Sequence, residues 1–169
     1  MDLPALIRRR TVRSYLPETV PDETLRRIVD LARWTGSARN RQPWRFVAVR
    51  DDGVRRELAT LGAYAGHLAA APVVLVVLSP AEQRLDTELD VGRVLQSLTL
   101  AASDAGLGSC VTSLYPEDRS VRAATLVGAP EGWVARHALA LGYAAPPAFV
   151  GRSAIPGGRL PVEELLRFR

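Results

Sequence analysis

The sequence predicts an α+β protein, a three-layer sandwich in which a mixed central β-sheet is flanked by helices. Three observations lead to this prediction. Residues 73–78 form a continuous apolar run rich in valine, typical of a central strand buried on both faces. From Leu25 to Ala32, apolar residues recur at the i, i+3, i+4 and i+7 spacing of an amphipathic helix. Residues 90–105 carry a wider apolar stripe, typical of a long helix packed on a core.

Predicted helices and strands alternate along the chain, separated by turn-forming residues. Pro21 suits the start of a helix, and Gly106 suits the left-handed conformation that ends one. We expect helices around 3–7 and at 21–32, 51–61, 90–105 and 117–127, and strands at 44–49, 73–78, 109–114 and 134–141. A proline- and glycine-rich arm at 146–169 follows, with a short structured piece at 162–166.

Length and composition indicate one globular domain spanning residues 1–169. This length can bury about 70% of the surface of the unfolded chain. The 47% apolar and 24% charged residues are ordinary globular values. No apolar run approaches the roughly 20 residues of a membrane span, and the N-terminus lacks the order of a secretory signal. Cys110 has no partner for a disulfide, so we expect a cytoplasmic protein in a reducing compartment.

The charge balance raises the possibility of nucleic-acid binding. The net charge is +4, and the chain has no lysine, so all 22 Lys and Arg positions are arginine. However, 18 acids are interleaved with them, and the one run of three arginines lacks aromatic residues that could stack on bases. An arginine-rich nucleic-acid-binding module therefore stays the less favoured alternative.

Two polar segments are candidates for a ligand site. Arg9, Arg10, Thr11 and Arg13 follow the first helix, where guanidinium groups and a hydroxyl can hold a phosphate. Their alternative role is a solvated cationic helix end that complements the dipole. The segment 37–44, Ser-Ala-Arg-Asn-Arg-Gln-Pro-Trp, offers hydroxyl and amide groups for the edge of a ring. Taken alone, these are also ordinary turn residues.

Four segments together resemble the nitroreductase family of FMN-dependent oxidoreductases. They are the arginine cluster, the Ser-x-x-Asn-x-Gln-Pro-Trp segment, the Gly-Leu-Gly-Ser-Cys segment at 106–110 and the Gly-Gly-Arg-Leu-Pro-Val-Glu-Glu segment at 157–164. They occur in the family's order over nearly the whole chain. The resemblance implies a homodimer of α+β subunits, with two FMN molecules at the interface and the long central helices packed on each other.

The resemblance also implies which residues bind the cofactor. Arg9, Arg10 and Thr11 match residues that hold the FMN phosphate and ribityl chain. Arg13 matches a cation near the flavin pyrimidine edge, where it would favour reduction. Ser37, Ala38, Asn40 and Gln42 match a loop that reaches FMN and that in this family often comes from the partner subunit. Thr112 and Ser113 match residues beside flavin N5. Arg159 matches a basic residue near the end of the chain that contacts the phosphate.

Three departures from the family pattern bear on function. Relatives often carry a second cation where this chain has Gly157, so part of the phosphate charge must be met by the extra arginines of the first cluster or not at all. Gly36 replaces the usual proline before the loop, which should loosen its backbone. Only about eleven residues separate Leu78 from Asp90, where larger relatives insert lid helices over the flavin. We therefore expect an unusually open pocket.

The implied reaction is ping-pong hydride transfer from NADH or NADPH, through flavin N5, to a nitroaromatic, a quinone or a related small-molecule acceptor. Because the flavin performs the chemistry, no catalytic side chain is assigned. His67 and His137 could donate a proton, although lone histidines are more often structural. Cys110 is expected to be a buried filler, and the histidines and cysteine show no metal-ligand spacing.

A second hypothesis keeps the flavin but changes the chemistry. A family relative of this kind would fragment flavin, dehalogenate a substrate or carry flavin without turning over nitro compounds.

Overall fold

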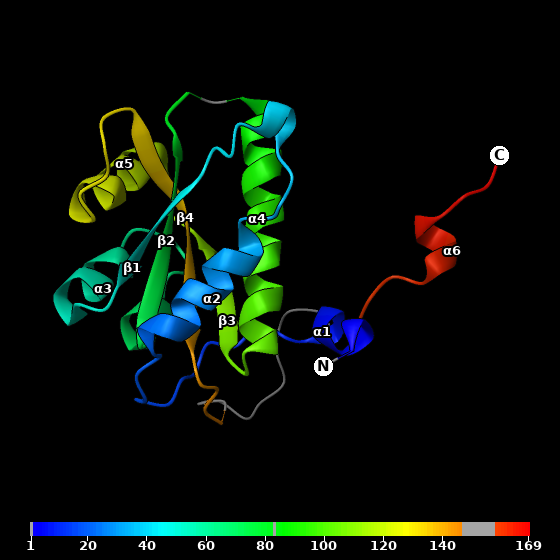
Figure 1. The fold of residues 1–169 in the computed structure, drawn as a ribbon, viewed down its shortest axis with the longest axis horizontal. Helices are drawn as coiled ribbons and strands as arrows, with labels where there is room; N and C mark the ends of the chain where they lie inside the picture. The colour runs from blue at the N-terminus through cyan, green and yellow to red at the C-terminus, as the bar shows by residue number, and fades with distance from the viewer. Residues whose placement is uncertain (1, 83, 147–157) are drawn as a thin grey trace.

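The computed structural model describes residues 2–82, 84–146 and 158–169. Four strands form one sheet, and helices pack on both of its faces (Figure 1). In chain order the elements are α1 (Leu3–Arg8), α2 (Asp22–Ala32), the 3-10 helix η1 (Ala38–Asn40), β1 (Arg45–Val49), α3 (Asp52–Leu58), the 3-10 helix η2 (Gly66–Ala70), β2 (Val73–Pro80), α4 (Leu85–Asp104), β3 (Gly108–Ser113), α5 (Glu117–Leu126), β4 (Trp133–Gly142) and α6 (Val162–Leu165).

The sheet has the strand order β1-β2-β4-β3. Every pairing between these strands is antiparallel, so the α+β class is confirmed and the prediction of a mixed sheet is corrected for the described residues. The valine-rich run predicted only that β2 is covered on both faces, a condition that does not determine the direction of its neighbours. Residues 73–79 of β2 are all buried, as that prediction requires.

Two apolar clusters, one on each face of the sheet, confirm the three layers. Val73, Leu75 and Val77 of β2 pack with α2 and α4. Val74, Val76 and Leu78 point the other way because successive side chains of a strand alternate, and they pack with α3, η2 and α5. Figure 1 shows these helices on opposite sides of the sheet.

Helix α4 begins five residues before the predicted position. Its first turns were missed because Leu85 and Leu89 are exposed and contribute nothing to the buried stripe. Asp86 and Glu88 in the first turn suit the positive end of the helix dipole. The end of the helix agrees with the prediction: Gly106 has a φ of +80°, and the Leu107 amide donates to the Ala102 carbonyl at 2.9 Å.

Both ends of the described chain expose apolar side chains. No residue of α1 is buried, and all of residues 158–169 are exposed, with α6 lying apart from the sheet and its helices (Figure 1). The predicted arm at 146–169 falls partly on residues 147–157, which lie outside the described residues. Among the helices that the structure describes, none is long and apolar enough to cross a membrane.

Candidate functional site

The arginine cluster surrounds a small hollow between α1, α4 and β3. The hollow measures about 260 Å³. Arg9, Arg10, Thr11 and Arg13 all line it, so the structure brings these four predicted residues together. The opposite wall comes from α4 and from the start of β3 and includes Gln96, Thr99, Ser103 and Ser109. The hollow therefore combines guanidinium, hydroxyl and amide groups, which suit a phosphate and a polyol chain.

The backbone after the cluster is held against the first residues of β3. The Val12 amide donates to the Ser109 carbonyl at 2.9 Å, and the Tyr15 hydroxyl donates to the Val12 carbonyl at 2.6 Å. A Cβ atom on Gly108 would lie 2.7 Å from the Val12 side chain. Glycine is required there because only a residue without a side chain lets the two segments approach this closely.

The positive charge of Arg13 affects the pKa of two nearby groups, His67 and Cys110. Burial, with the charge of Arg13 as the next cause, lowers the pKa of His67. Burial raises the pKa of the Cys110 thiol, an effect that Arg13 opposes. Cys110 is only 2% exposed, which confirms it as a small buried residue and leaves it in the thiol form at neutral pH.

The predicted ring-binding loop has a strained, internally bonded backbone. Arg39, Asn40 and Gln42 have φ angles of 53°, 54° and 49°, in the left-handed region that non-glycine residues rarely adopt. The Ser37 hydroxyl accepts a hydrogen bond from the backbone amide of Gln42 at 2.9 Å. The side-chain amide of Gln42 donates to Asn40 Oδ1 at 3.2 Å. Such strain persists where surrounding contacts over-determine the loop, often at ligand sites.

Two acids of α4 hold this loop, and sequence reasoning missed both. Asp90 Oδ2 accepts a hydrogen bond from the Ala38 amide at 2.8 Å, although Asp90 is only 2% exposed. Asp86, one turn earlier, pairs with Arg41, which lowers the pKa of the Asp86 carboxyl. The available signal was three acids at alternate positions, Asp86, Glu88 and Asp90, at the start of this helix.

Arg93 of α4 packs over the entrance to the loop. Its Nη1 lies 3.5 Å from Asp90 Oδ1, and its Nη2 would be 3.1 Å from a Cβ atom on Gly36. Glycine at position 36 therefore leaves room for the arginine that accompanies the buried carboxylate.

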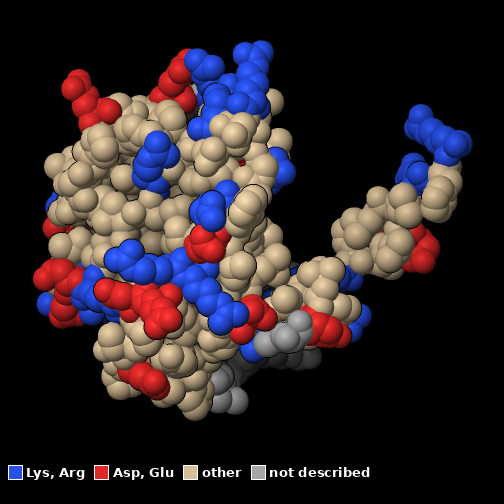
Figure 2. Space-filling view, viewed as in Figure 1, with Lys and Arg blue, Asp and Glu red and all other residues tan. Residues whose placement is uncertain are grey.

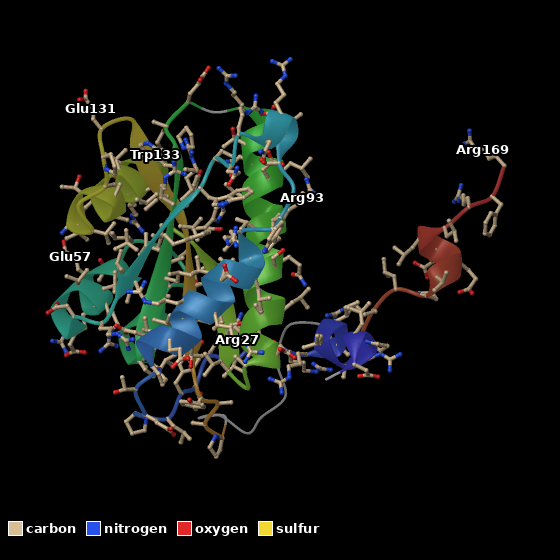
Figure 3. All side chains as sticks on the ribbon, in the orientation of Figure 1. Arg27, Glu57, Arg93, Glu131, Trp133 and Arg169 are labelled. Carbon is tan, nitrogen blue, oxygen red and sulfur yellow. The ribbon has the colours of Figure 1, made fainter. Side chains whose placement is uncertain are left out.

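The cluster and the loop lie at opposite ends of α4. The hollow beside the cluster touches Ser103, whereas the loop is held by Asp90. Thirteen residues of helix at 1.5 Å each separate these anchors by about 20 Å. In Figure 3, Arg93 marks the loop end of α4, and Arg27, which pairs with Asp104 at 3.7 Å, marks the opposite end. One chain therefore does not bring the two predicted half-sites together.

Thr112 and Ser113 end β3 and point to opposite faces of the sheet. Thr112 is buried, and its hydroxyl lies 2.9 Å from His67 Nε2. Ser113 is exposed, and its hydroxyl lies 3.3 Å from His137 Nδ1. His137 Nε2 in turn lies 3.4 Å from Glu88 Oε2. Each predicted histidine thus contacts one of the two residues predicted to lie near flavin N5.

Arg159 is the one predicted site residue that the described contacts leave apart from the others. It is exposed, and its guanidinium donates to the neighbouring Gly158 carbonyl at 2.7 Å. Within the described ranges, no hydrogen bond or ion pair joins it to the arginine cluster. Gly157 lies outside the described residues.

Two further hollows lie away from the arginine cluster. The larger, about 1020 Å³, is a groove between α2 and the edge strand β1. The other, about 360 Å³, adjoins the loop and is lined by Arg41, Gln42, Arg45 and Trp133 among others. Arg45 lies over the Trp133 ring, 5.0 Å from its centre. Among the residues that the structure describes, no group of three or more histidine, cysteine, aspartate or glutamate side chains could hold a metal ion.

The fold is that of an α+β protein with two separate groups of polar residues predicted to bind a ligand, and comparison with known proteins gives the family. The nitroreductase family matches residues 6–65 and 59–143. A protein of Methanothermobacter thermautotrophicus, provisionally named an NADH dehydrogenase/NAD(P)H nitroreductase, is 31% identical over 85% of this chain and 77% of its own. A protein of the same provisional name from Archaeoglobus fulgidus is 29% identical over 80% of each chain. This chain belongs to the nitroreductase family.

Solved structures show the same fold. One from Bacteroides thetaiotaomicron, with the same provisional name, superposes with a TM-score of 0.81 at 24% identity and covers 98% of this chain and 95% of its own. An FMN-dependent nitroreductase from Clostridium difficile gives a TM-score of 0.76 at 21% identity, covering 88% of this chain and 91% of its own. At these identities the likeness concerns the fold alone.

Proposed function

We propose that the protein is an FMN-dependent oxidoreductase that transfers hydride from NADH or NADPH to a nitroaromatic, a quinone or a related acceptor by a ping-pong mechanism. Membership of the nitroreductase family supports this proposal, as do the nicotinamide-linked names of the archaeal relatives. Bound FMN would carry the hydride between the two substrates. The residues of the chain would bind the cofactor, orient it and tune its charge.

The observation that carries the proposal is the position of the two half-sites at opposite ends of α4. Two α4 helices packed antiparallel about a twofold axis would place the arginine cluster of each chain beside the partner's loop. The exposed side of α4 suits such packing. Leu85 and Leu89 are 93% and 65% exposed, and a Cβ atom on Gly92 would meet no atom within 4 Å. We infer a homodimer with two FMN sites, each formed by the arginine cluster of one chain and the loop of its partner.

The groups around the cluster fit FMN. Arg9, Arg10 and Thr11 supply charged and hydroxyl donors for a phosphate, inside a hollow whose other wall includes hydroxyl and amide side chains. Arg13 would sit at the pyrimidine edge, where a fixed cation stabilises the negative charge that gathers there on reduction. None of the described residues that line this hollow is acidic, so its lining favours an anionic ligand.

The loop would supply the polar edge that orients the ring. Its internal hydrogen bonds and its attachment to Asp90 fix the backbone before a ligand arrives. Side-chain amides at Asn40 and Gln42 can donate and accept at once, which suits the mixed edge of an isoalloxazine. A loop that is already ordered loses less conformational entropy on binding.

The connection between β2 and α4 offers little chain to cover the ring. Only residues 81–84 connect β2 to α4, a connection that is too short for lid helices. We therefore propose an open acceptor site that takes flat acceptors of varied size. Flavin-dependent chemistry of another kind, or flavin carriage, would leave the same cofactor site but no turnover of such acceptors.

Nucleic-acid binding receives no support from the face of the molecule shown in Figure 2. On the face shown in Figure 2, acidic atoms are interleaved with the arginines, and no broad field of one sign is formed. Many arginines also have an acidic partner, as Arg50 has Asp22 at 2.5 Å and Arg122 has Glu57. A phosphate backbone would need clustered, uncompensated cations.

An absorption spectrum of the purified protein tests the proposal. We expect a yellow dimer with bound FMN that bleaches under NADH or NADPH and regains its colour when a quinone is added. A yellow protein that bleaches but reduces no nitro compound or quinone would favour the other flavin chemistries. A colourless monomer that ignores added FMN would overturn the proposal.

A further inference from the structure

We propose that Ser113, His137 and Glu88 form a proton relay that delivers a proton to the acceptor. This inference rests on the proposed function and adds to it, because that function assigns hydride transfer to the cofactor and leaves the source of the proton open. The relay would act beside the position predicted for flavin N5, where Ser113 is exposed at the end of β3.

The three side chains come from three elements and meet on the α4 face of the sheet. Ser113 and His137 are cross-strand partners in the β3–β4 pairing. Their Oγ and Nδ1 atoms are 3.3 Å apart, and the other ring nitrogen of His137 lies 3.4 Å from Glu88 Oε2. The order is carboxylate, imidazole, hydroxyl, with the hydroxyl at the surface. Imidazole can accept a proton at one nitrogen while donating from the other, as a relay requires.

The surroundings hold the carboxylate in place for this role. Glu88 is half-buried, and Arg136 Nη1 lies 3.5 Å from its Oε1. Arg136 is itself fixed by hydrogen bonds to the carbonyls of Pro80 and Ala81, at 3.0 and 2.8 Å. Oε1 of Glu88 is buried and lacks a hydrogen bond within the described part of the chain. The charged groups that face His137 are thus Glu88 and, behind it, Arg136.

His67, the other histidine, has the opposite environment. Its ring nitrogens lie against the Thr112 hydroxyl and the Tyr64 carbonyl, and no carboxylate accompanies it in the described contacts. Burial and the charge of Arg13 lower its pKa. His67 is therefore held in its neutral form, whereas Nε2 of His137 lies 3.4 Å from a carboxylate and its Nδ1 lies 3.3 Å from an exposed hydroxyl. This contrast selects His137 as the proton donor.

Reduction of a quinone acceptor requires one hydride and one proton. The quinone takes a hydride, which carries both electrons, from the reduced cofactor, and one of its carbonyl oxygens takes a proton from Ser113 Oγ. Ser113 recovers a proton from Nδ1 of the protonated His137, which leaves a neutral imidazole whose Nε2–H still faces Glu88. Water then returns a proton to His137, and the product is the hydroquinone.

The test compares two acceptors on the flavin-loaded protein. A benzoquinone needs a proton for each hydride, whereas ferricyanide takes electrons and no proton. The flavin is reduced by light and EDTA, so the result does not depend on nicotinamide, and its reoxidation is followed by stopped flow. For His137→Gln and Glu88→Gln we expect reoxidation by the quinone to slow by about a hundredfold, the lower end of the range for a lost general acid, with the ferricyanide rate retained.

Several outcomes would overturn the relay. Equal slowing with both acceptors would show a structural role for His137, and unchanged quinone rates would show that water supplies the proton. Glu57→Gln, which changes a carboxylate of α3 paired with Arg122 of α5, is the matched control and should leave both rates unchanged. If the protein binds FMN but no nicotinamide bleaches it, the proposed function fails while this comparison still decides the relay.

A second measurement needs no bound flavin. Because the chain has only two histidines, the ¹⁵N resonances of both imidazole rings can be assigned with a His67→Gln variant. We expect Glu88→Gln to shift the Nε2 resonance of His137 and Ser113→Ala to shift its Nδ1 resonance. An imidazole that responds to neither substitution would contradict the geometry on which the relay depends.

Discussion

The buried carboxylate of Asp90 accepts a hydrogen bond from the backbone amide of Ala38 at 2.8 Å, and so ties the strained loop to the central helix. Nothing in the sequence spacing of 52 residues marks this pair. The bond gives the loop a fixed place at one end of α4, and the proposed cofactor site depends on that place.

Removing this tether should weaken FMN binding more than it weakens the fold. Asp90→Ala leaves the Ala38 amide without its acceptor, at a cost of about 1–3 kcal/mol, whereas Asp90→Asn keeps an oxygen that can accept. We expect FMN affinity, measured by flavin fluorescence quenching, to be highest for the wild type, lower for Asp90→Asn and lowest for Asp90→Ala. Equal affinities for the Asn and Ala variants would show that the bond does not position the loop.

The arginine assignments are tested by charge removal. Arg9→Ala together with Arg159→Ala should shed FMN while the dimer survives, because phosphate contacts are lost and the exposed stripe of α4 is untouched. The two single variants separate the contribution of Arg9, which lines the hollow, from that of Arg159, which the described contacts leave apart from it. Gel filtration and flavin absorbance give the readout. If the double variant bound FMN as tightly as the wild type, the assignment of these arginines to the phosphate would be wrong.

The tight approach at Gly108 predicts a stability effect. Gly108→Ala would push a Cβ atom to 2.7 Å from Val12, and overpacking of this kind costs about 1–3 kcal/mol in the free energy of unfolding. Urea denaturation measures that cost. Gly66→Ala, where a Cβ atom meets nothing within 4 Å, is the control. A Gly108 variant as stable as the control would mean that the Val12 segment moves aside freely.

The exposed side of α4 predicts the interface. Leu89→Glu places a charge within the proposed helix pair without disturbing a buried side chain of the chain itself, because Leu89 is 65% exposed. We expect a folded monomer by light scattering and circular dichroism, with FMN lost because each site then lacks its other half. A dimer that retains FMN would place the interface elsewhere.

His67 predicts a pH dependence of stability. Its pKa is lowered in the folded state below the ordinary value of 6.5, so between the two values the unfolded chain binds more protons. Stability should therefore fall as the pH drops below about 6.5. His67→Gln should remove part of that loss when unfolding is measured from pH 8 to pH 5. An unchanged slope would show that His67 titrates alike in both states.

The sequence predicted the parts of the fold that depend on burial periodicity. The β2 run and the apolar stripe of α4 were recognised because buried side chains repeat with the period of their element. The first turn of α4 was missed, since Leu85 is exposed and a helix edge that faces solvent or a partner carries no such period. Strand direction was also missed, because burial on two faces is compatible with either direction.

The candidate site was predicted as a set of residues rather than as an arrangement. Arg9 to Arg13 do gather around one hollow, a short-range consequence of lying next to each other in the chain. The tether from Asp90 and the pairing of His137 with Glu88 join distant elements. Contacts of this range follow from strand register and helix packing, which no local pattern specifies.

Subunit complementation tests the central claim, that each FMN lies between the cluster of one chain and the loop of the other. One variant carries Arg9→Ala and Arg10→Ala, the second Asn40→Ala and Gln42→Ala, and each homodimer alone should lose FMN. After the two are unfolded and refolded together, the account predicts that mixed dimers regain flavin at one of their two sites, measured by absorbance after gel filtration. A mixture as colourless as its separate components would contradict the shared site.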